Sequence, residues 1–431
     1  MCLRGPQGSP VSRQDEAGPI FNGGPDQVKP VVVKFGGTSL GDAGAICRAV
    51  NIVRTHLEIG QPVIIVVSAM GNTTDRLVRL AQKIGPADIP RRELDLLLSA
   101  GERISMSLFS IALARYGVRA RSYTGSQVGI ITDTAHSDAR IIDIKGERII
   151  KDLELGIVPI IAGFQGVSIE KEVTTLGRGG SDVTALALAA AFKCQQCYLY
   201  TDVDGVFTED PSTFKGVRLI NEINFDEMFE LSSRGAEVIH PRACAIAARF
   251  KIEVWTGKDR GTGTWIKGGK MEKIEVKAIT HEMDLQRITM SDVPKRRSSI
   301  SQVITKLAKE GIGIKFFFHG TGADKFDLSF VLSKEDGEKA ISLMRSTGIG
   351  EMEIHRDKNL ASVTLVGYGI GSEPEILNQV FTTFEKNKIH IEAVTTSELS
   401  ISCLIKNRYV NRVVRGLLKN FRLVNEDSRR T

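Results

Sequence analysis

The chain has 431 residues, with 57 Lys and Arg against 51 Asp and Glu, a formal charge of +6 and 42% hydrophobic residues. This ordinary globular composition excludes a fully disordered, collagen-like or coiled-coil protein, and the length suggests about three domains. The small net charge and the aromatic content of 6% argue against nucleic acid as a partner.

Residues 1–28 are rich in Gly, Pro, Gln and Ser and predict a disordered tail. Apolar runs such as Val63–Val67 and Ala185–Phe192 are far shorter than the roughly 20 residues of a membrane span. We therefore expect no membrane association. Six cysteines in a chain of this length do not make a disulfide framework, which favours a cytoplasmic protein.

Strands and helices alternate through residues 29–267. The predicted strands are Val31–Val33, Val63–Val67, Ile157–Ile161 and Cys197–Tyr200, and the predicted helices are Ala43–Leu57, Leu94–Tyr116, Val183–Phe192 and Asp226–Leu231. This alternation predicts an α/β fold of three layers, αβα, around a mostly parallel central sheet. Ligands of such sheets bind at the carboxyl ends of the strands.

The chain repeats itself beyond a polar, glycine-bearing linker near residue 268. Ile300–Ile314 aligns with Leu377–Ile391, so that Val303 corresponds to Val380. Each copy reads as a strand, a helix, two strands and a helix. We predict two ferredoxin-like βαββαβ units, at 276–355 and 360–425.

The first predicted strand runs into a turn that contains Gly36, Gly37 and Ser39. Glycines after a strand let backbone N–H groups approach phosphate oxygens closely. Lys34, beside this turn, could neutralise charge on a phosphoryl group that is being transferred. A generic strand turn remains the alternative for these residues taken alone.

A second glycine-rich segment, Thr175–Asp182, precedes a predicted helix. It supplies the Arg178 guanidinium, which can bind a carboxylate through two hydrogen bonds, and the hydroxyl of Ser181. Asp182 could orient a lysine or meet Mg²⁺ through water. The segment fits neither the dinucleotide nor the Walker phosphate-binding motif, and a structural turn is the alternative.

Three further segments add polar groups. Thr74 follows the strand Val63–Val67, and Glu102 lies next to a glycine in a helical stretch, where it could accept a hydrogen bond from an ammonium group. A surface glutamate is the alternative for Glu102. Thr201, Asp202 and Phe207 follow the strand Cys197–Tyr200 and suit the edge of a nucleotide site.

Taken together, these segments resemble the aspartokinases of the amino-acid kinase family, and the repeated C-terminal units resemble ACT domains. The resemblance covers roughly residues 30–425. It rests on Lys34-Phe-Gly-Gly-Thr-Ser, Val67-Ser-Ala-Met, Ser99-Ala-Gly-Glu102, Gly163-Phe-Gln-Gly166, Thr175-Leu-Gly-Arg-Gly-Gly-Ser-Asp182, Tyr200-Thr-Asp-Val-Asp-Gly and Val238-Ile-His-Pro-Arg242.

The resemblance implies that the γ-phosphate of ATP is transferred to the side chain of L-aspartate, the first step of the pathway to lysine, threonine, methionine or a specialised product. Lys34 and Asp182 would be catalytic. Binding of ATP would fall to Lys34, Gly36, Gly37, Ser39, Thr201, Asp202 and Phe207. Binding of aspartate would fall to Thr74, Glu102, Thr175, Arg178 and Ser181.

The resemblance also implies Mg²⁺ held through the ATP phosphates rather than by dedicated side chains, and an amino-acid effector at the ACT units. We expect a homo-oligomer, because isolated ACT units expose sheet edges. Two other hypotheses remain: a weakly active or silent amino-acid-sensing partner subunit, and a kinase of another amino-acid carboxylate such as glutamate.

Two positions depart from the family pattern. Ser212 stands where the family often has an arginine near the phosphates, and Glu237 stands where a lysine is common. Both changes remove positive charge from the expected nucleotide site. We therefore expect weak or rerouted contacts with ATP.

Overall fold

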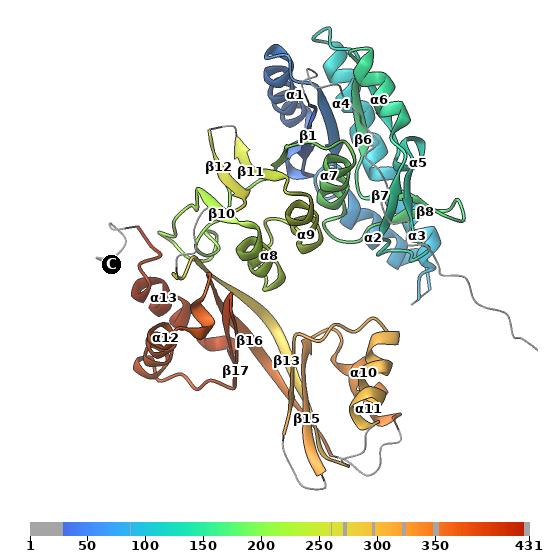
Figure 1. Ribbon diagram of the computed structural model, residues 1–431. Coiled ribbons are helices and arrows are strands. Elements are labelled where there is room, and N and C mark those ends of the chain that lie inside the picture. Colours follow the sequence, from blue (N-terminus) through green and yellow to red (C-terminus); the bar gives the residue numbers. More distant parts are fainter. Residues whose placement is uncertain are drawn as a thin grey trace, which may run out of the picture.

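The computed structural model describes residues 29–86, 88–259, 261–269, 274–294, 298–320, 325–347 and 353–425 (Figure 1). The predicted tail, residues 1–28, lies outside the described residues. Within them, an α/β region comes first, here called the N-terminal part (residues 29–269). A second region built on one antiparallel sheet follows, here called the C-terminal part (residues 274–425).

An eight-stranded sheet in the order β10-β12-β11-β9-β1-β2-β6-β3 forms the centre of the N-terminal part. Six of these strands are parallel, whereas β12 runs antiparallel to β11. The strands are β1 (Val31–Phe35), β2 (Val63–Val67), β3 (Ala120–Tyr123), β6 (Val158–Ala162), β9 (Gln196–Tyr200), β10 (Glu222–Asn224), β11 (Glu253–Asp259) and β12 (Thr262–Lys267).

Helices cover both faces of this sheet and make three layers (Figure 1). The layer on one face packs around Phe35, Val53 and Phe109, and it consists of α1 (Ala43–Glu58) and α4 (Ala100–Ala114). The layer on the other face packs around Val32 and Leu186. It contains α6 (Glu147–Glu154), α7 (Gly180–Ala191), α8 (Phe225–Ser233) and α9 (Pro241–Phe250).

A four-stranded sheet, β5-β4-β7-β8, flanks the central one. Sequence patterns did not predict it, because strands of three or four residues are too short to show periodicity. The last strand leads directly into the turn before α7, so this sheet positions the second glycine-rich segment. Its strands are β4 (Ile130–Thr132), β5 (Ile141–Ile144), β7 (Gln165–Ser168) and β8 (Val173–Thr175), with α5 (Gly125–Val128) beside them.

The predicted helical stretch Leu94–Tyr116 forms two helices, α3 (Arg91–Leu98) and α4, joined at Ser99. The combined stretch, Arg91–Ala114, is long and apolar enough to cross a membrane, which the search for continuous apolar runs overlooked. Its inner face, however, packs against the central sheet, and Phe109 and Leu113 are fully buried there. The high hydropathy of this stretch is therefore explained by the burial of one of its faces in the protein core.

The C-terminal part has one six-stranded antiparallel sheet in the order β14-β15-β13-β16-β18-β17. Its strands are β13 (Ala278–Pro294), β14 (Phe316–His319), β15 (Lys325–Ser333), β16 (Glu353–Val366), β17 (Ala393–Ser397) and β18 (Ser400–Lys406). Its helices are α10 (Ser299–Lys309), α11 (Gly337–Arg345), α12 (Pro374–Lys386) and α13 (Val410–Asn420).

The long strands β13 and β16 pass through both repeats. Residues 285–294 of β13 pair with β15, whereas residues 278–282 pair with residues 362–366 of β16, in the second repeat. Each repeat thereby gains the four-strand order of a ferredoxin-like unit. The expected opening of the first unit at residue 276 is thus wrong in one respect: residues 278–282 complete the sheet of the second unit.

The loop after β9 joins the two parts of the molecule. The Ile279 amide donates to the Thr208 carbonyl at 2.8 Å, and the Thr208 hydroxyl donates to the Leu423 carbonyl at 2.6 Å. Close by, His281 Nδ1 lies 2.5 Å from a carboxylate oxygen of Glu209. The first strand of the C-terminal sheet is therefore bonded directly to a loop that leaves the central sheet.

Candidate active site

Lys34 and Asp182 meet above the carboxyl end of β1. Lys34 Nζ lies 2.6 Å from Asp182 Oδ1, and each side chain is 12% exposed. Neighbouring residues of a strand point to opposite faces, so Lys34 faces the α7 layer while Phe35 packs in the α1–α4 layer. Asp182 lies in the first turn of α7. A cation and a carboxylate thus stand between the two glycine-rich turns.

The first glycine turn packs tightly against the turn after β2. The Gly71 amide donates to the Gly37 carbonyl at 2.8 Å, and a Cβ on Gly37 would lie 2.7 Å from the Ala69 carbonyl oxygen. The Gly36 amide donates to the Tyr200 carbonyl at 2.9 Å. The Gly36 amide thus continues the bonding between β1 and β9, so in this geometry its N–H is already used and a contact of Gly36 with phosphate would have to come from elsewhere in the turn.

Glu102 lies in the first turn of α4, beside the turn after β2, and is 3% exposed. Its carboxylate accepts a hydrogen bond from the Ala69 amide at 3.1 Å, and its Oε2 has no partner among the described residues. Burial raises the pKa of Glu102 to about 7. A buried oxygen that lacks a donor suits a cationic ligand. Thr74, in the first turn of α2 (Thr73–Ile84), is partly exposed.

The second glycine turn presents Arg178 to solvent. Gly179 has a positive φ of 66° and leads into α7, where Ser181 is 8% exposed. Thr175 is 1% exposed, and its hydroxyl donates to Asp95 Oδ1 at 2.6 Å. The only hydroxyl proton of Thr175 is therefore bonded within the protein. The sequence-based expectation was that this hydroxyl would contact the substrate.

The residues expected to border the nucleotide fall into two separate cavities. Ser39, Thr201 and Asp202 line a cavity of about 110 Å³ beside α1. Phe207 and Glu237 line another, of about 350 Å³, which we call the β13 pocket because that strand forms part of its wall. Phe207 thus shares neither cavity with Thr201 and Asp202.

The β13 pocket is electronegative. Glu209, Asp210 and Glu237 line it together with His281, and no lysine or arginine is among the described residues of its wall. Ser212 is not part of this wall, and its amide and hydroxyl both donate to the Asp210 carboxylate at 2.8 Å. Of the two departures from the family pattern, only Glu237 changes the charge of this wall.

Two charged residues that sequence reasoning missed hold the second glycine turn. Asp95 in α3 is fully buried against it, and Arg242 in α9 donates to the Leu176 carbonyl at 2.8 Å. The one sequence feature that could have indicated a structural role for Asp95 is its position inside the apolar run Leu94–Leu98. Arg242 ends the motif Val238-Ile-His-Pro-Arg242.

The residues around Lys34 fit a metal that arrives with the nucleotide. Asp182 is the one carboxylate in contact with Lys34 among the described residues, and no group of three or more His, Cys, Asp or Glu within the described ranges could hold a metal. Mg²⁺ commonly keeps its waters and binds through substrate phosphates plus one or two carboxylates. This donor set is compatible with that mode.

Comparison with known proteins identifies the family. Residues 29–256 match the amino acid kinase family, and residues 363–421 match the ACT domain. An aspartokinase of Geobacillus stearothermophilus is 40% identical over 92% of this chain and 98% of its own. Aspartokinase 2 of Bacillus subtilis is 38% identical over 91% and 98%. The chain belongs to the aspartokinases, within the amino acid kinase family.

Solved aspartokinase structures share this architecture. Aspartokinase III of E. coli, in complex with aspartate and ADP, superposes with a TM-score of 0.80 over 91% of this chain and 99% of its own, at 24% identity, which shows a common fold. Aspartate kinase from Synechocystis is 34% identical, with a TM-score of 0.51 over 91% of this chain and 69% of its own. The αβα and ACT architecture is thus confirmed.

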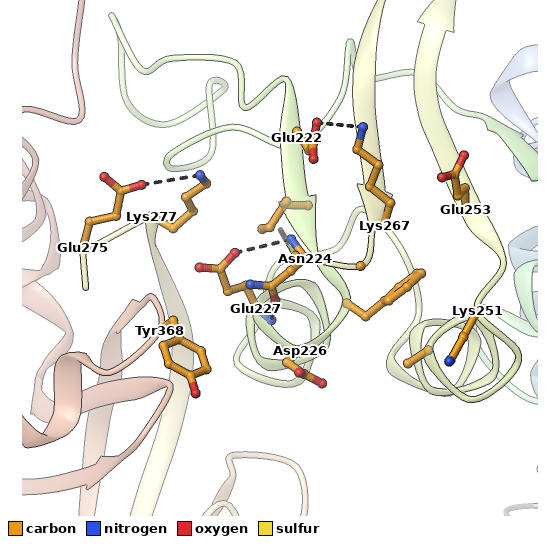
Figure 2. Close-up of a pocket in the computed structure, with 15 residues that line it drawn as sticks. Glu222, Asn224, Asp226, Glu227, Lys251, Glu253, Lys267, Glu275, Lys277 and Tyr368 are labelled. Atoms are coloured by element: carbon orange, nitrogen blue, oxygen red, sulfur yellow. Dashed lines mark hydrogen bonds and ion pairs between the residues drawn. The ribbon is translucent and has the colours of Figure 1, made fainter. Parts of the chain in front are cut away.

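A further cavity of about 1330 Å³ lies away from Lys34, between β10, α8 and the start of the C-terminal part (Figure 2). Two ion pairs join neighbouring groups of its wall, Lys267 with Glu222 at 2.8 Å and Lys277 with Glu275 at 3.7 Å, and Asp226, Lys251 and Glu253 also line it. Glu227 binds the amide of Asn224 and caps α8. None of the glycine-rich segments that meet at Lys34 lines this cavity.

Proposed function

We propose that this protein is an aspartate kinase, which transfers the γ-phosphate of ATP to the side-chain carboxylate of L-aspartate and forms 4-phospho-L-aspartate. The observation that carries the proposal is the Lys34–Asp182 pair, at 2.6 Å, between two glycine-rich turns at the carboxyl end of the sheet. Relatives of 38 and 40% identity over almost the whole chain, all named aspartokinases, support aspartate as the substrate.

The chemistry needs charge neutralisation rather than a base. The attacking carboxylate is already ionised at pH 7, so catalysis consists of positioning and of stabilising charge on the transferred group. Lys34 would bind the γ-phosphoryl oxygens. Asp182 would hold the Lys34 ammonium at the turn and keep it directed at the phosphoryl group.

Aspartate would be recognised through its two backbone-derived groups. The α-ammonium would donate to the open Oε2 of Glu102, and that contact would offset the cost of burying this carboxylate. The exposed Arg178 guanidinium would bind the α-carboxylate through two hydrogen bonds. Thr74 and Ser181 would add hydroxyl contacts.

The nucleotide would lie between Lys34 and the β13 pocket. Glu209 and Glu237 suit the hydroxyl groups of a ribose better than phosphates, so the triphosphate would extend toward Lys34 and the Gly37 turn. Mg²⁺ bound to the triphosphate would neutralise part of its charge.

The C-terminal part would bind an amino-acid effector and pair with a second copy. Strands β14 and β17 form the two edges of its sheet, and an unpaired edge favours pairing with another chain. The cysteines among the described residues are free thiols, which suits a protein of the cytoplasm.

A silent amino-acid-sensing subunit is the second candidate, and the carboxylates of the β13 pocket favour it. A hydroxamate assay with ATP, Mg²⁺ and L-aspartate separates the two. The kinase should form aspartyl hydroxamate, and glutamate or N-acetylglutamate should not replace aspartate. A folded protein that forms no hydroxamate would sink the proposed activity, and product from glutamate alone would reassign the substrate.

A further inference from the structure

Two segments next to the expected aspartate site are joined to each other along their length. One is the second glycine turn, residues 175–179, which carries Arg178. The other is the loop 133–140, between β4 and β5. The Ala139 amide donates to the Thr175 carbonyl at 2.9 Å, and Gly177 packs against Ser137 and Asp138 so closely that a Cβ there would lie 3.1 Å from either.

Asp95 binds both segments from one side. Its Oδ1 accepts the Thr175 hydroxyl at 2.6 Å, and its Oδ2 lies 2.7 Å from His136 Nδ1. Both oxygens also lie 3.1 Å from the Ser137 amide, and the Ser137 hydroxyl approaches Oδ1 at 3.3 Å. Asp95 has no solvent exposure. A buried carboxylate is tolerated only with such partners, so these contacts fix the geometry of both segments.

Arg242 binds the same two segments from the other side. Its guanidinium donates to the Leu176 carbonyl and to the Ala139 carbonyl, each at 2.8 Å, and to Asp138 Oδ1 at 3.1 Å. The ring of His240, two residues earlier, packs under Gly179, where any side chain would collide with it. The beginning of the turn is therefore held by Asp95, and its end is held by residues at the start of α9.

Arg178 itself is exposed, and its guanidinium has no hydrogen-bond or ion-pair partner among the described residues. Its position therefore depends on the turn that carries it. A displacement of about 1 Å in a substrate-positioning group can cost on the order of 100-fold in rate. The turn is bound near its beginning by Asp95 and farther along by Arg242.

We propose that Asp95 and Arg242 are positioning residues for aspartate binding, which act through Arg178 by fixing its turn from both sides. This inference rests on the proposed function, in which Arg178 binds the α-carboxylate of aspartate. It assigns Thr175 to the scaffold of the turn, since its proton is bonded to Asp95. Neither positioning residue needs to touch substrate.

The test combines each change with loss of Arg178. Asp95→Asn and Arg242→Gln are each made alone and together with Arg178→Ala, and steady-state kinetics are measured for aspartate and ATP. Each single change should raise the KM for aspartate roughly tenfold, with kcat and the KM for ATP within about twofold. In the Arg178→Ala background, the same change should add less than about twofold, because its route of action is already lost.

Asp152→Asn is the matched control. Asp152 is also a fully buried carboxylate, bound to Tyr123 and Arg121 at the far edge of the sheet. It should lower the melting temperature and leave the KM for aspartate unchanged. The inference would be overturned if Asp95→Asn raised the KM for aspartate as much in the Arg178→Ala background as in the wild type. It would also be overturned if Asp95→Asn by itself left this KM unchanged. If Asp95→Asn does not fold, Arg242→Gln decides by the same criterion. An inactive wild type would instead refute the proposed function.

Discussion

On the proposed aspartate side of the site, polar groups are buried and bonded to one another, whereas the proposed nucleotide side, the β13 pocket, is lined by carboxylates and borders the C-terminal part. Asp95 and Thr175 are sealed from solvent and hold a turn in place. The β13 pocket, by contrast, contains the exposed Glu237 and takes one wall from the C-terminal sheet. Buried polar groups with fixed partners suit the selection of a small substrate. A pocket that takes one wall from the C-terminal sheet suits control of nucleotide binding by that part of the chain.

The largest effect is expected for Lys34, which would contact the transferred phosphoryl group between the aspartate and the nucleotide. Lys34→Met removes the ammonium and keeps the length of the side chain, so kcat should fall by about 10³-fold, as for the loss of a main transition-state donor. The KM for aspartate should change little. Asp182 would lose its partner, so Lys34→Met/Asp182→Asn serves as the control for an uncompensated charge. Either variant keeping more than a tenth of wild-type kcat would contradict the role of Lys34.

Glu102→Gln probes the aspartate side. The neutral amide cannot form an ion pair with the substrate ammonium, so kcat/KM for aspartate should fall by about 100-fold while the KM for ATP holds. Because the pKa of Glu102 is raised to about 7 by burial, kcat/KM of the wild type should also fall as the pH drops below about 7. The variant should lack this dependence. A wild-type profile that is flat between pH 6 and 8 would contradict the assignment.

The same change should stabilise the folded protein in alkaline solution. A carboxyl whose folded pKa is about 7, against a reference value of 4.5, weakens the fold progressively as the pH rises from 4.5 to 7. At pH 8 the penalty is on the order of 3 kcal/mol, and glutamine would remove it. Thermal unfolding at pH 8 should show a higher melting temperature for Glu102→Gln, a difference that should shrink toward pH 5.

Glu237→Lys probes the nucleotide side. Replacing a carboxylate of the β13 pocket by an ammonium should lower the KM for ATP by roughly tenfold at low salt. Glu154→Lys, the same charge change on the exposed end of α6, is the matched control and should have little effect. Equal effects of the two variants would show that only the net charge of the protein matters. They would contradict the placement of the nucleotide at the β13 pocket.

The smallest effect concerns the contact between the two parts of the molecule. The hydrogen bond that the His281 ring donates to the Glu209 carboxylate raises the pKa of His281, against the effect of burial. Such a pair stabilises the fold below the ordinary histidine pKa and loses its effect as the pH rises through the raised value. His281→Gln should therefore lower the free energy of unfolding by about 1 kcal/mol at pH 6 and have no effect near pH 9. A loss that is the same at both pH values would exclude the ion pair.

Much of the architecture could be predicted from the sequence, because its signals are local. Continuous β-branched strands that alternate with helices predict a parallel sheet, and the carboxyl ends of neighbouring strands gather at one edge. That rule explains the place of Lys34 but not its approach to Asp182, because Asp182 follows β8, a strand of the separate four-stranded sheet. In the C-terminal part, the repeated pattern predicted both units but not the sharing of β13, because strand pairing between residues 278–282 and β16 leaves no local signal.

Parts of the site depended on contacts that no local pattern contains. The Gly36 amide is taken by Tyr200, and the Thr175 hydroxyl by Asp95, 80 residues away. In each case a group that looked available in sequence is bonded by a distant partner. Phe207 was placed with Thr201 because they are close in the chain, yet the loop between them carries Phe207 to the β13 pocket.

Phosphorus NMR of the wild-type protein with ATP, Mg²⁺ and L-aspartate tests the central claim most directly. We expect an acyl-phosphate resonance that grows as the γ-phosphate of ATP disappears and that depends on both Lys34 and aspartate. Loss of ATP to free phosphate alone, or no reaction by the folded protein, would contradict it.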